Sequence, residues 1–367
     1  MFSRLFLYFK NLDWIIFSAV ILLVSFGLIE IYSISLGKGG LDLMNFYKQI
    51  IFIFIGLFAF FFFAFNDYHF LRSFSNYIYL LGLILLGAVL IFGIDVRGSR
   101  AWFSFGYFNL QPVEFAKIFL LIFLARFFSR YSLRINPLKN LFLSGLGVFV
   151  FVFLVLAQPD FGSACLLLVM WLFMLLVAGF ERKYFLIIGL GLIISFILGW
   201  FFFFADYQKD RIRVFLNPDT KSIDQGYNIS QAIIAVGSGG LTGRGVGFGS
   251  QSQLKFLPEA QNDFIFAVIA EELGFLGIVL LLTFFACFFF RSLWSLRKIN
   301  NNFGVLFILG AVGLIFIEMF INIGMNIGIL PVVGLSLPFV SYGGSSLLAN
   351  FIIVGIIESI IVRSRFS

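Results

Sequence analysis

An aspartate stands where a long polar segment of this chain gives way to an apolar run. Residues 256–274 contain Asp263 followed by mostly hydrocarbon side chains, and the sequence before it is largely polar for more than fifty residues. A carboxylate beside hydrocarbon costs free energy unless it is paired or used. Two uses fit this position: capping the N-terminus of the helix that follows, or accepting a proton as a general base.

A carboxylate and an amine lie three residues apart in Gln111-Pro-Val-Glu-Phe-Ala-Lys117. On a helix, Glu114 and Lys117 would share a face and could neutralise each other. One interpretation is therefore a buried structural ion pair. The other is a phosphate site, in which basic side chains attract the phosphate and an aromatic ring forms a wall. In that site Arg97, Arg100 and Lys117 attract the phosphate and Trp102 forms the wall; Gln111 and Glu114 are further substrate-binding candidates in this segment.

Two further polar segments interrupt the apolar sequence. The turn Gln158-Pro-Asp-Phe-Gly162 places Asp160 either as a helix N-cap or as a second acidic group near a substrate or a divalent cation. Residues 237–249 are rich in glycine, which allows a ligand to approach the backbone closely, although a flexible lid fits equally well. No strand precedes these glycines, so they are not a dinucleotide-binding fingerprint.

The last polar segment, residues 322–346, combines prolines, glycines and clustered hydroxyls within apolar sequence. Membranes tolerate broken helices of this kind where protein or an aqueous cavity surrounds them. Tight packing of small residues between helices is the alternative. Ser341 and Tyr342 are the candidate substrate-binding residues in this segment.

The composition indicates the class of protein that carries these residues. Of the 367 residues, 61% are hydrophobic and 12% are charged, and the mean hydropathy is +1.06. A soluble domain could not cover so much apolar surface. We therefore predict an all-α integral membrane protein with a single domain over residues 1–367. Apolar runs near the roughly 20 residues that a membrane helix needs predict ten spans, at 14–34, 48–66, 76–94, 112–128, 140–157, 160–179, 184–204, 264–290, 303–329 and 338–362.

Charge orients the predicted spans. Lys and Arg are more frequent in the short loops on the side that holds both termini, so this side is predicted to be cytoplasmic. The large loop between the seventh and eighth helices, residues 205–262, then faces outward, with a short interfacial helix near 228–240. The chain has no Walker motif, and we expect neither a nucleotide cofactor nor a nucleic-acid partner.

Taken in order, these segments resemble the SEDS proteins, the family of shape, elongation, division and sporulation. The opening Leu12-Asp13-Trp14 and the short tails are similar to those of the elongation members, the RodA group. The division group, FtsW, shares the core motifs, so membership of that group remains an alternative. The motifs that carry the resemblance are Gly98-Ser-Arg-Ala-Trp102, Gln158-Pro-Asp-Phe-Gly162, Gly237-Ser-Gly-Gly240, Leu257-Pro-Glu-Ala-Gln-Asn-Asp-Phe264 and Leu337-Pro-Phe-Val-Ser-Tyr-Gly-Gly-Ser-Ser346.

The resemblance implies a peptidoglycan glycosyltransferase that polymerises lipid II into glycan strands for cell-wall elongation. It also implies a place in the bacterial inner membrane, among membrane lipids, with a class B penicillin-binding protein as partner. Asp263 matches the essential acid of the family and becomes the catalytic candidate. The residues that match other polar positions of the family are Gln111, Glu114, Lys117, Asp160 and Arg211.

The expected reaction is a single inverting displacement. Asp263 takes the proton of an acceptor hydroxyl, and a polyprenyl pyrophosphate leaves. Basic side chains, or a divalent cation such as Mg²⁺ or Mn²⁺, stabilise the leaving group. Two other classes of function stay open. A flippase for the lipid-linked precursor would need a charged pathway that continues toward the cytoplasmic side. A non-catalytic scaffold for the penicillin-binding protein would not need an acid at residue 263.

Overall fold

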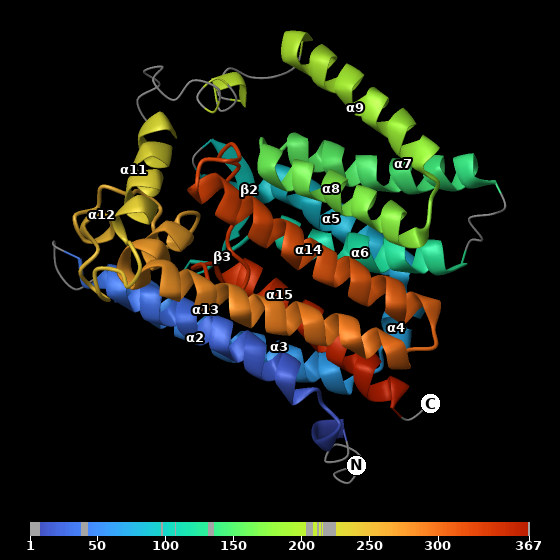
Figure 1. The fold of residues 1–367 in the computed structure, drawn as a ribbon. Helices are drawn as coiled ribbons and strands as arrows, with labels where there is room; N and C mark the ends of the chain where they lie inside the picture. Colours follow the sequence, from blue (N-terminus) through green and yellow to red (C-terminus); the bar gives the residue numbers. More distant parts are fainter. Residues whose placement is uncertain are drawn as a thin grey trace.

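The chain folds into a bundle of long helices (Figure 1). The computed structural model describes residues 8–37, 43–96, 98–106, 108–130, 136–202, 208–210, 213, 215 and 225–365. Each of the ten predicted spans coincides with a helix, which confirms the all-α membrane class. The ten helices are α2 (Trp14–Ser35), α3 (Met44–Phe65), α5 (Ser75–Phe92), α6 (Pro112–Arg130), α7 (Pro137–Leu156), α8 (Phe161–Ala178), α9 (Arg182–Phe202), α13 (Ile265–Ser295), α14 (Asn302–Asn326) and α15 (Gly344–Ser364).

One of these helices is more polar than the rest. Within the described residues, nine helices are long and apolar enough to cross a membrane, and α6 is not among them. Helix α6 has 19 residues and carries Glu114, Lys117 and two arginines. Glu114 and Lys117 are buried inside the bundle, at 7% and 4% exposure. Lipid therefore does not meet these two charges, which is the arrangement in which a membrane helix can carry them.

The helices differ in how much protein surrounds them. Most side chains of α14 and α15 are buried, so these helices form the centre of the bundle. In α9, by contrast, Tyr184 and Gly199 are the buried residues, and Figure 1 shows this helix angled away from its neighbours. Its exposed apolar side chains suit contact with lipid. The final predicted span began too early, because residues 338–343 form a turn and α15 starts at Gly344.

Polar contacts tie the two ends of the chain together at one end of the bundle. Asp13, which precedes α2, lies 2.7 Å from Arg291 on α13 and 3.3 Å from Arg365 after α15. The start of the first span and the end of the last therefore lie on the same side, as an even number of crossings requires. That this side is cytoplasmic remains a prediction.

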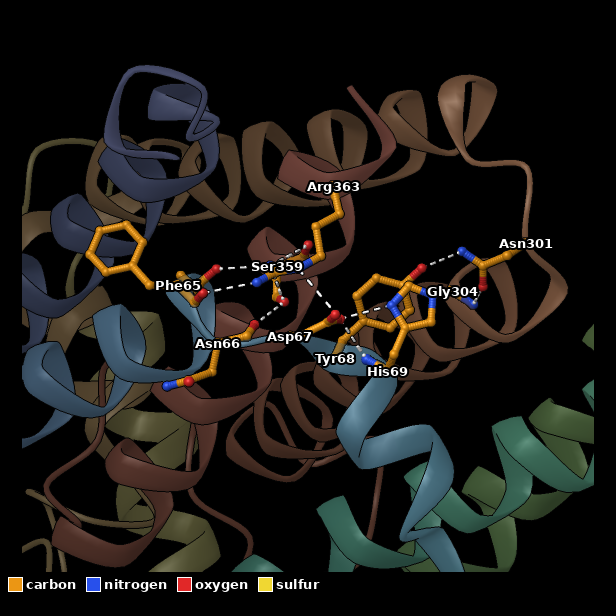
Figure 2. A network of polar contacts seen from close by, with 10 residues as sticks. Phe65, Asn66, Asp67, Tyr68, His69, Asn301, Gly304, Ser359 and Arg363 are labelled. Carbon is orange, nitrogen blue, oxygen red and sulfur yellow. Dashed lines mark hydrogen bonds and ion pairs between the residues drawn. The ribbon is translucent and has the colours of Figure 1, made fainter. Parts of the chain in front are cut away.

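Arg363 adds a second link at this end of the bundle (Figure 2). From α15 its guanidinium donates a hydrogen bond to the carbonyl of Phe65 (2.8 Å) and lies 3.4 Å from Asp67. The carbonyls in the last turn of a helix have no partner within that helix. Arg363 thus supplies a donor to the end of α3 and packs α15 against it.

Short elements connect the spans on both sides. Residues 94–110 form a small antiparallel sheet in the order β1-β2-β3, which the sequence analysis did not foresee. In this sheet Phe103 pairs with Leu110. The connecting elements are β1 (Ile94–Val96), β2 (Ser99–Ser104), β3 (Asn109–Leu110), α4 (Tyr68–Ser73), α11 (Gln225–Ser238), α12 (Ser250–Gln253) and the 3-10 helix η1 (Leu296–Lys298). Helix α11 overlaps the segment predicted to be interfacial, and its depth in the membrane remains a prediction.

The glycine segment, residues 237–249, is docked against a break in α13. The helix loses its regular backbone at Gly274 (φ 65°, ψ −161°). Across this break, the N–H of Arg244 donates to the carbonyl of Glu271 (3.0 Å), and the N–H of Phe275 donates to the carbonyl of Gly240 (2.9 Å). Backbone groups that the broken helix cannot pair inside itself are therefore satisfied by the glycine segment.

Candidate active site

A cavity of about 360 Å³ lies where the connections between the helices meet. Its walls come from six separate parts of the chain: the start of α3, the small sheet with α6, the start of α8, the turn before α13, the middle of α14, and the turn before α15. Six of the predicted site residues line it, namely Trp102, Gln111, Glu114, Lys117, Asp263 and Tyr342. Segments far apart in sequence therefore converge on one chamber that is large enough for part of a sugar.

Asp263 lies on the turn that leads into α13. The N-cap residue of α13 is Phe264, and no side chain caps the helix there. The capping alternative for Asp263 is therefore wrong. Asp263 and Gly334 both line the cavity, and a Cβ built on Gly334 would lie 3.6 Å from Asp263 Oδ2. A side chain at residue 334 would thus stand against the carboxylate.

The turn before α15 is hydrogen-bonded to the turn that carries Asp263. The N–H of Tyr342 donates to the carbonyl of Gln261 (2.8 Å), and the hydroxyl of Ser341 donates to the carbonyl of Asn262 (2.6 Å). The same hydroxyl accepts from the N–H of Leu337 (2.8 Å). Ser341 is 5% exposed and does not line the cavity. It therefore joins two backbone segments, whereas Tyr342 faces the cavity.

Lys117 forms a buried charge cluster with two carboxylates. Its Nζ lies 2.9 Å from Glu114 Oε2 on the same helix and 2.5 Å from Glu318 Oε1 on α14. The predicted ion pair between Glu114 and Lys117 is present, and Glu318, to which the sequence analysis gave no role, completes it. All three residues line the cavity. Two carboxylates around one ammonium leave this wall without spare positive charge.

Asp160 caps a helix and also touches the rim of the site. Its carboxylate accepts from the N–H of Ser163 (3.0 Å) at the start of α8, and from the side chain of Gln111 at 3.4 Å. Burial raises the pKa of the Asp160 carboxyl, and the hydrogen bonds from Ser163 oppose that shift. Asp160 does not line the cavity, although Ser163 and Gln111 do. Asp160 is therefore the N-cap of α8, as the capping interpretation predicts. Any effect of Asp160 on a substrate would act through Ser163 and Gln111.

Among the predicted cations that the structure describes, Lys117 lines the cavity and Arg100 does not. Arg100 is exposed and lies 3.2 Å from Asp95, outside the cavity lining. Arg97 and Arg211 lie outside the described residues. Lys48, to which the sequence analysis gave no role in the site, lines the cavity from the first turns of α3. The sequence feature that could have identified Lys48 as a site residue is its position at the start of a predicted span, on the side where the polar motifs gather. Glu259 and Asn262 also line the cavity.

Comparisons with known proteins agree along nearly the whole chain. The family model FTSW_RODA_SPOVE, described as cell cycle protein, matches residues 13–365. The chain is similar to the peptidoglycan glycosyltransferase MrdB of Escherichia coli K12, at 41% identity over 292 residues, which is 79% of this chain and 78% of that protein. It is also similar to stage V sporulation protein E of Bacillus subtilis, at 36% identity over 370 residues, covering 96% and 98% of the two chains.

Solved structures show the same architecture. A chain from a peptidoglycan synthase complex, described as structurally coordinating polymerization and crosslinking, superimposes with a TM-score of 0.82 at 27% identity, covering 97% of this chain and 99% of that one. The rod shape determining protein RodA of Thermus thermophilus gives a TM-score of 0.72 at 28% identity, covering 97% and 98% of the two chains.

Proposed function

This chain belongs to the cell cycle protein family of FtsW, RodA and SpoVE, and we propose that it is a peptidoglycan glycosyltransferase of the RodA type that polymerises lipid II. The observation that carries the proposal is the placement of Asp263. Asp263 lines a cavity of about 360 Å³ at the ends of membrane helices. A lipid-linked sugar could enter such a cavity with its polyprenyl tail left among the helices.

Asp263 is the general base in this proposal. The 4-hydroxyl of the acceptor sugar attacks the anomeric carbon of the donor, and its proton passes to the Asp263 carboxylate. The bond between the anomeric carbon and the phosphate oxygen breaks, and the pyrophosphate leaves with the bonding electrons. A single displacement of this kind inverts the anomeric centre. A correctly placed base contributes about 10²–10⁴-fold to the rate of such a step.

The pyrophosphate leaving group needs a positively charged side chain close to it. The sequence suggested Lys117, but the cavity favours Lys48. Lys117 is already neutralised by Glu114 and Glu318. Lys48 lines the same cavity and, within the part of the chain that the structure describes, has no ion pair. An ammonium held at the edge of a low-dielectric site stabilises a developing pyrophosphate charge strongly. We therefore assign Lys48 to the pyrophosphate.

The described residues do not fit a resident metal ion. Among them, no group of three or more His, Cys, Asp or Glu side chains is placed to hold one. Mg²⁺ is commonly bound through one or two carboxylates together with substrate phosphates. We propose that any requirement for Mg²⁺ or Mn²⁺ reflects cation carried by the pyrophosphate, and we derive no step through a metal.

The proposal places the protein in a bacterial inner membrane, with both termini cytoplasmic and the cavity on the outer side. Its partner is a class B penicillin-binding protein that crosslinks the strands made here. This partner is supported by the structural similarity to a chain from a peptidoglycan synthase complex that coordinates polymerization and crosslinking. The extent of that similarity, 97% of this chain, is greater than a shared subdomain would give.

The test is Asp263→Asn in the purified protein with its penicillin-binding partner, supplied with labelled lipid II. Amide and carboxylate have nearly the same shape, so the change removes the base and keeps the packing. Asp95→Asn is the matched control, because Asp95 is exposed and pairs with Arg100 away from the cavity. We expect polymer formation to fall about 10²–10⁴-fold in Asp263→Asn and to stay near normal in Asp95→Asn.

Other outcomes would point to the two remaining classes of function. Unchanged polymer in Asp263→Asn would reject the base assignment. If instead wild-type protein makes no polymer but scrambles lipid II across vesicles, the chain is a flippase. If it does neither, yet raises the crosslinking rate of its partner, it is a scaffold.

A further inference from the structure

We propose that Asn322 and Asn326 are positioning residues, which hold the main chain of Asp263 so that its carboxylate faces the substrate. The inference rests on the proposed role of Asp263 as the base. Asn322 Nδ2 donates to the carbonyl oxygen of Asp263 at 3.0 Å, and Asn326 Nδ2 donates to the same oxygen at 2.9 Å. Both asparagines lie on α14, four residues apart and therefore on one face of that helix.

Asn322 joins two walls of the cavity. Besides the Asp263 carbonyl, its Nδ2 reaches the carbonyl oxygen of Leu335 at 2.7 Å. Asp263 and Leu335 both line the cavity, on the turns before α13 and α15 respectively. One carboxamide therefore fixes the separation of the two turns between which a sugar would bind. A displacement of either turn would stretch this bridge.

Asn326 fixes the direction in which α13 leaves the turn. Its Oδ1 accepts from the N–H of Ala267 at 3.1 Å, while its Nδ2 donates to the carbonyl of Asp263. The first N–H groups of a helix have no acceptor within that helix, and no side chain of its own caps α13. The N–H of Ala267 also donates to the carbonyl of Phe264 at 3.0 Å, so Asn326 supplies a second acceptor for it from a neighbouring helix. One side chain thus contacts the Asp263 carbonyl and the N–H of Ala267 in the first turn of α13.

The two side chains use their hydrogen-bonding capacity on each other and on the turn. Asn326 Nδ2 also reaches the backbone carbonyl of Asn322 at 2.8 Å. Both asparagines are fully buried, and a polar group buried in an apolar bundle is costly unless it is satisfied. Apolar residues could pack α14 at lower cost. The geometry therefore points to a requirement at the Asp263 main chain rather than to packing of the bundle.

The role differs from catalysis, because the amides contact the carbonyl of Asp263 and not its carboxylate. Three consecutive carbonyls are held in this way: Gln261 by the N–H of Tyr342, Asn262 by the hydroxyl of Ser341, and Asp263 by the two asparagines. Misplacing a catalytic group by about 1 Å can cost on the order of 10²-fold in rate. The asparagines are expected to act on the rate through the position of Asp263.

The test compares Asn322→Leu and Asn326→Leu with Asn350→Leu in the full-length protein bound to its penicillin-binding partner. Leucine has a similar volume and removes the carboxamide. Asn350 is a matched control, since it is buried in α15, does not line the cavity, and its Nδ2 has no partner among the described residues. Initial rates of lipid II polymerisation are measured against lipid II concentration and pH, and are normalised to folded protein by size-exclusion chromatography.

We expect kcat to fall about 10- to 100-fold in both variants, with KM changed less than about twofold. The acid limb of the pH profile should also move, because the carboxylate has a new environment. Asn350→Leu should keep kcat and the pH profile. Asn326→Gln, which keeps the carboxamide, should recover part of kcat. A purely structural role would lower the melting temperature and the folded yield, and would leave kcat per folded molecule and the pH profile unchanged.

The outcomes separate this inference from the proposed function. If Asp263→Asn is inactive while both leucine variants keep full kcat, the positioning role is wrong and the base assignment stands. If Asp263→Asn is fully active, both are wrong. Should a leucine variant fail to accumulate, Asn322→Ala and Asn326→Ala take its place, since alanine also removes the carboxamide and adds no bulk. Normal kcat in the alanine variants would equally overturn the inference.

Discussion

The ammonium group of Lys117 lies 2.5 Å from Glu318 Oε1, although 201 residues separate the two in sequence. The contact joins α6 to α14 inside the bundle, and Glu114 completes it at 2.9 Å. Both carboxylates and the ammonium are at most one tenth exposed. Opposite charges placed this close in a low-dielectric interior depend on one another. The cluster therefore explains how α6 can carry charge through the bundle.

The first prediction concerns stability and is tested by Lys117→Met. Methionine keeps most of the length of lysine but leaves two buried carboxylates without a cation. Breaking a buried pair in this way costs about 3–5 kcal/mol, so the melting temperature in detergent should fall sharply. Lys183→Met is the control, because Lys183 is exposed and water screens its pair with Glu181. Equal melting temperatures for the two variants would contradict a stabilising role for the cluster.

The second prediction separates Lys48 from Lys117 in the reaction. Lys48→Met removes a cation that lines the cavity and has no ion pair in the described chain. It should therefore lower kcat/KM for lipid II by about 10- to 100-fold. This loss corresponds to roughly 1.4–2.8 kcal/mol of transition-state stabilisation. The folded yield should be nearly normal. Lys139→Met, at an exposed residue of α7, is the control. A normal kcat/KM in Lys48→Met would exclude Lys48 from pyrophosphate binding.

The sequence predicted the elements that obey local rules. Hydropathy located the ten long helices, including the closely spaced α7 and α8, and nine of them, all but α6, are long and apolar enough within the described residues to cross a membrane. Asp263 was singled out because a carboxylate at the start of an apolar helix is costly. The ion pair of Glu114 and Lys117 followed from their spacing on one helix. Each of these inferences needs only residues that are close together in the chain.

Relationships between distant residues were not predictable in this way. Glu318 stood alone in sequence, since its partner Lys117 lies on another helix. Lys48 was given no role in the site, and Ser341 was assigned to substrate although its hydroxyl joins two backbone segments. The strands at 94–110 are two to six residues long, which is too short for alternation of polar and apolar residues to be seen. Tertiary pairing, rather than local pattern, decides each of these cases.

The third prediction is a pH dependence at Asp67. Burial by itself would raise the pKa of this carboxyl, but hydrogen bonds from His69 and the charge of Arg363 outweigh it and hold the pKa below its usual value. A lowered pKa contributes stability above the unfolded-state value of about 3.9, and this contribution is lost as the pH falls through the lower folded-state value. Asp67→Asn should therefore be destabilising at pH 7, and the difference from wild type should shrink below about pH 4.

The size of that effect should be small, because the Asp67 side chain is 57% exposed and water screens its interactions. We expect less than about 1 kcal/mol at pH 7. Melting temperatures of wild type and Asp67→Asn, measured in one detergent across the pH range, give the comparison. A difference that widens on acidification would show that the charge of Asp67 opposes folding.

The last prediction concerns the break in α13 at Gly274. A Cβ at this residue would lie 2.3 Å from the backbone nitrogen of Gly243 and 2.8 Å from the carbonyl carbon of Leu241. Its backbone angles, φ 65° and ψ −161°, fall in a region that is essentially restricted to glycine and costs other residues about 1–3 kcal/mol. Gly274→Ala should thus force the glycine segment away from α13 and lower the melting temperature.

Gly237→Ala provides the matched comparison, because the same chemical change should act in the opposite direction. Gly237 lies in α11, and a Cβ there would meet no atom within 4 Å. Alanine in a helix is more favourable than glycine by up to about 1 kcal/mol, so Gly237→Ala should leave the melting temperature unchanged or raise it slightly. Opposite signs for the two substitutions require that the glycine segment be docked on α13 through its backbone. Similar small effects would indicate that residues 240–245 leave α13 readily, and that the break in α13 is not held by them.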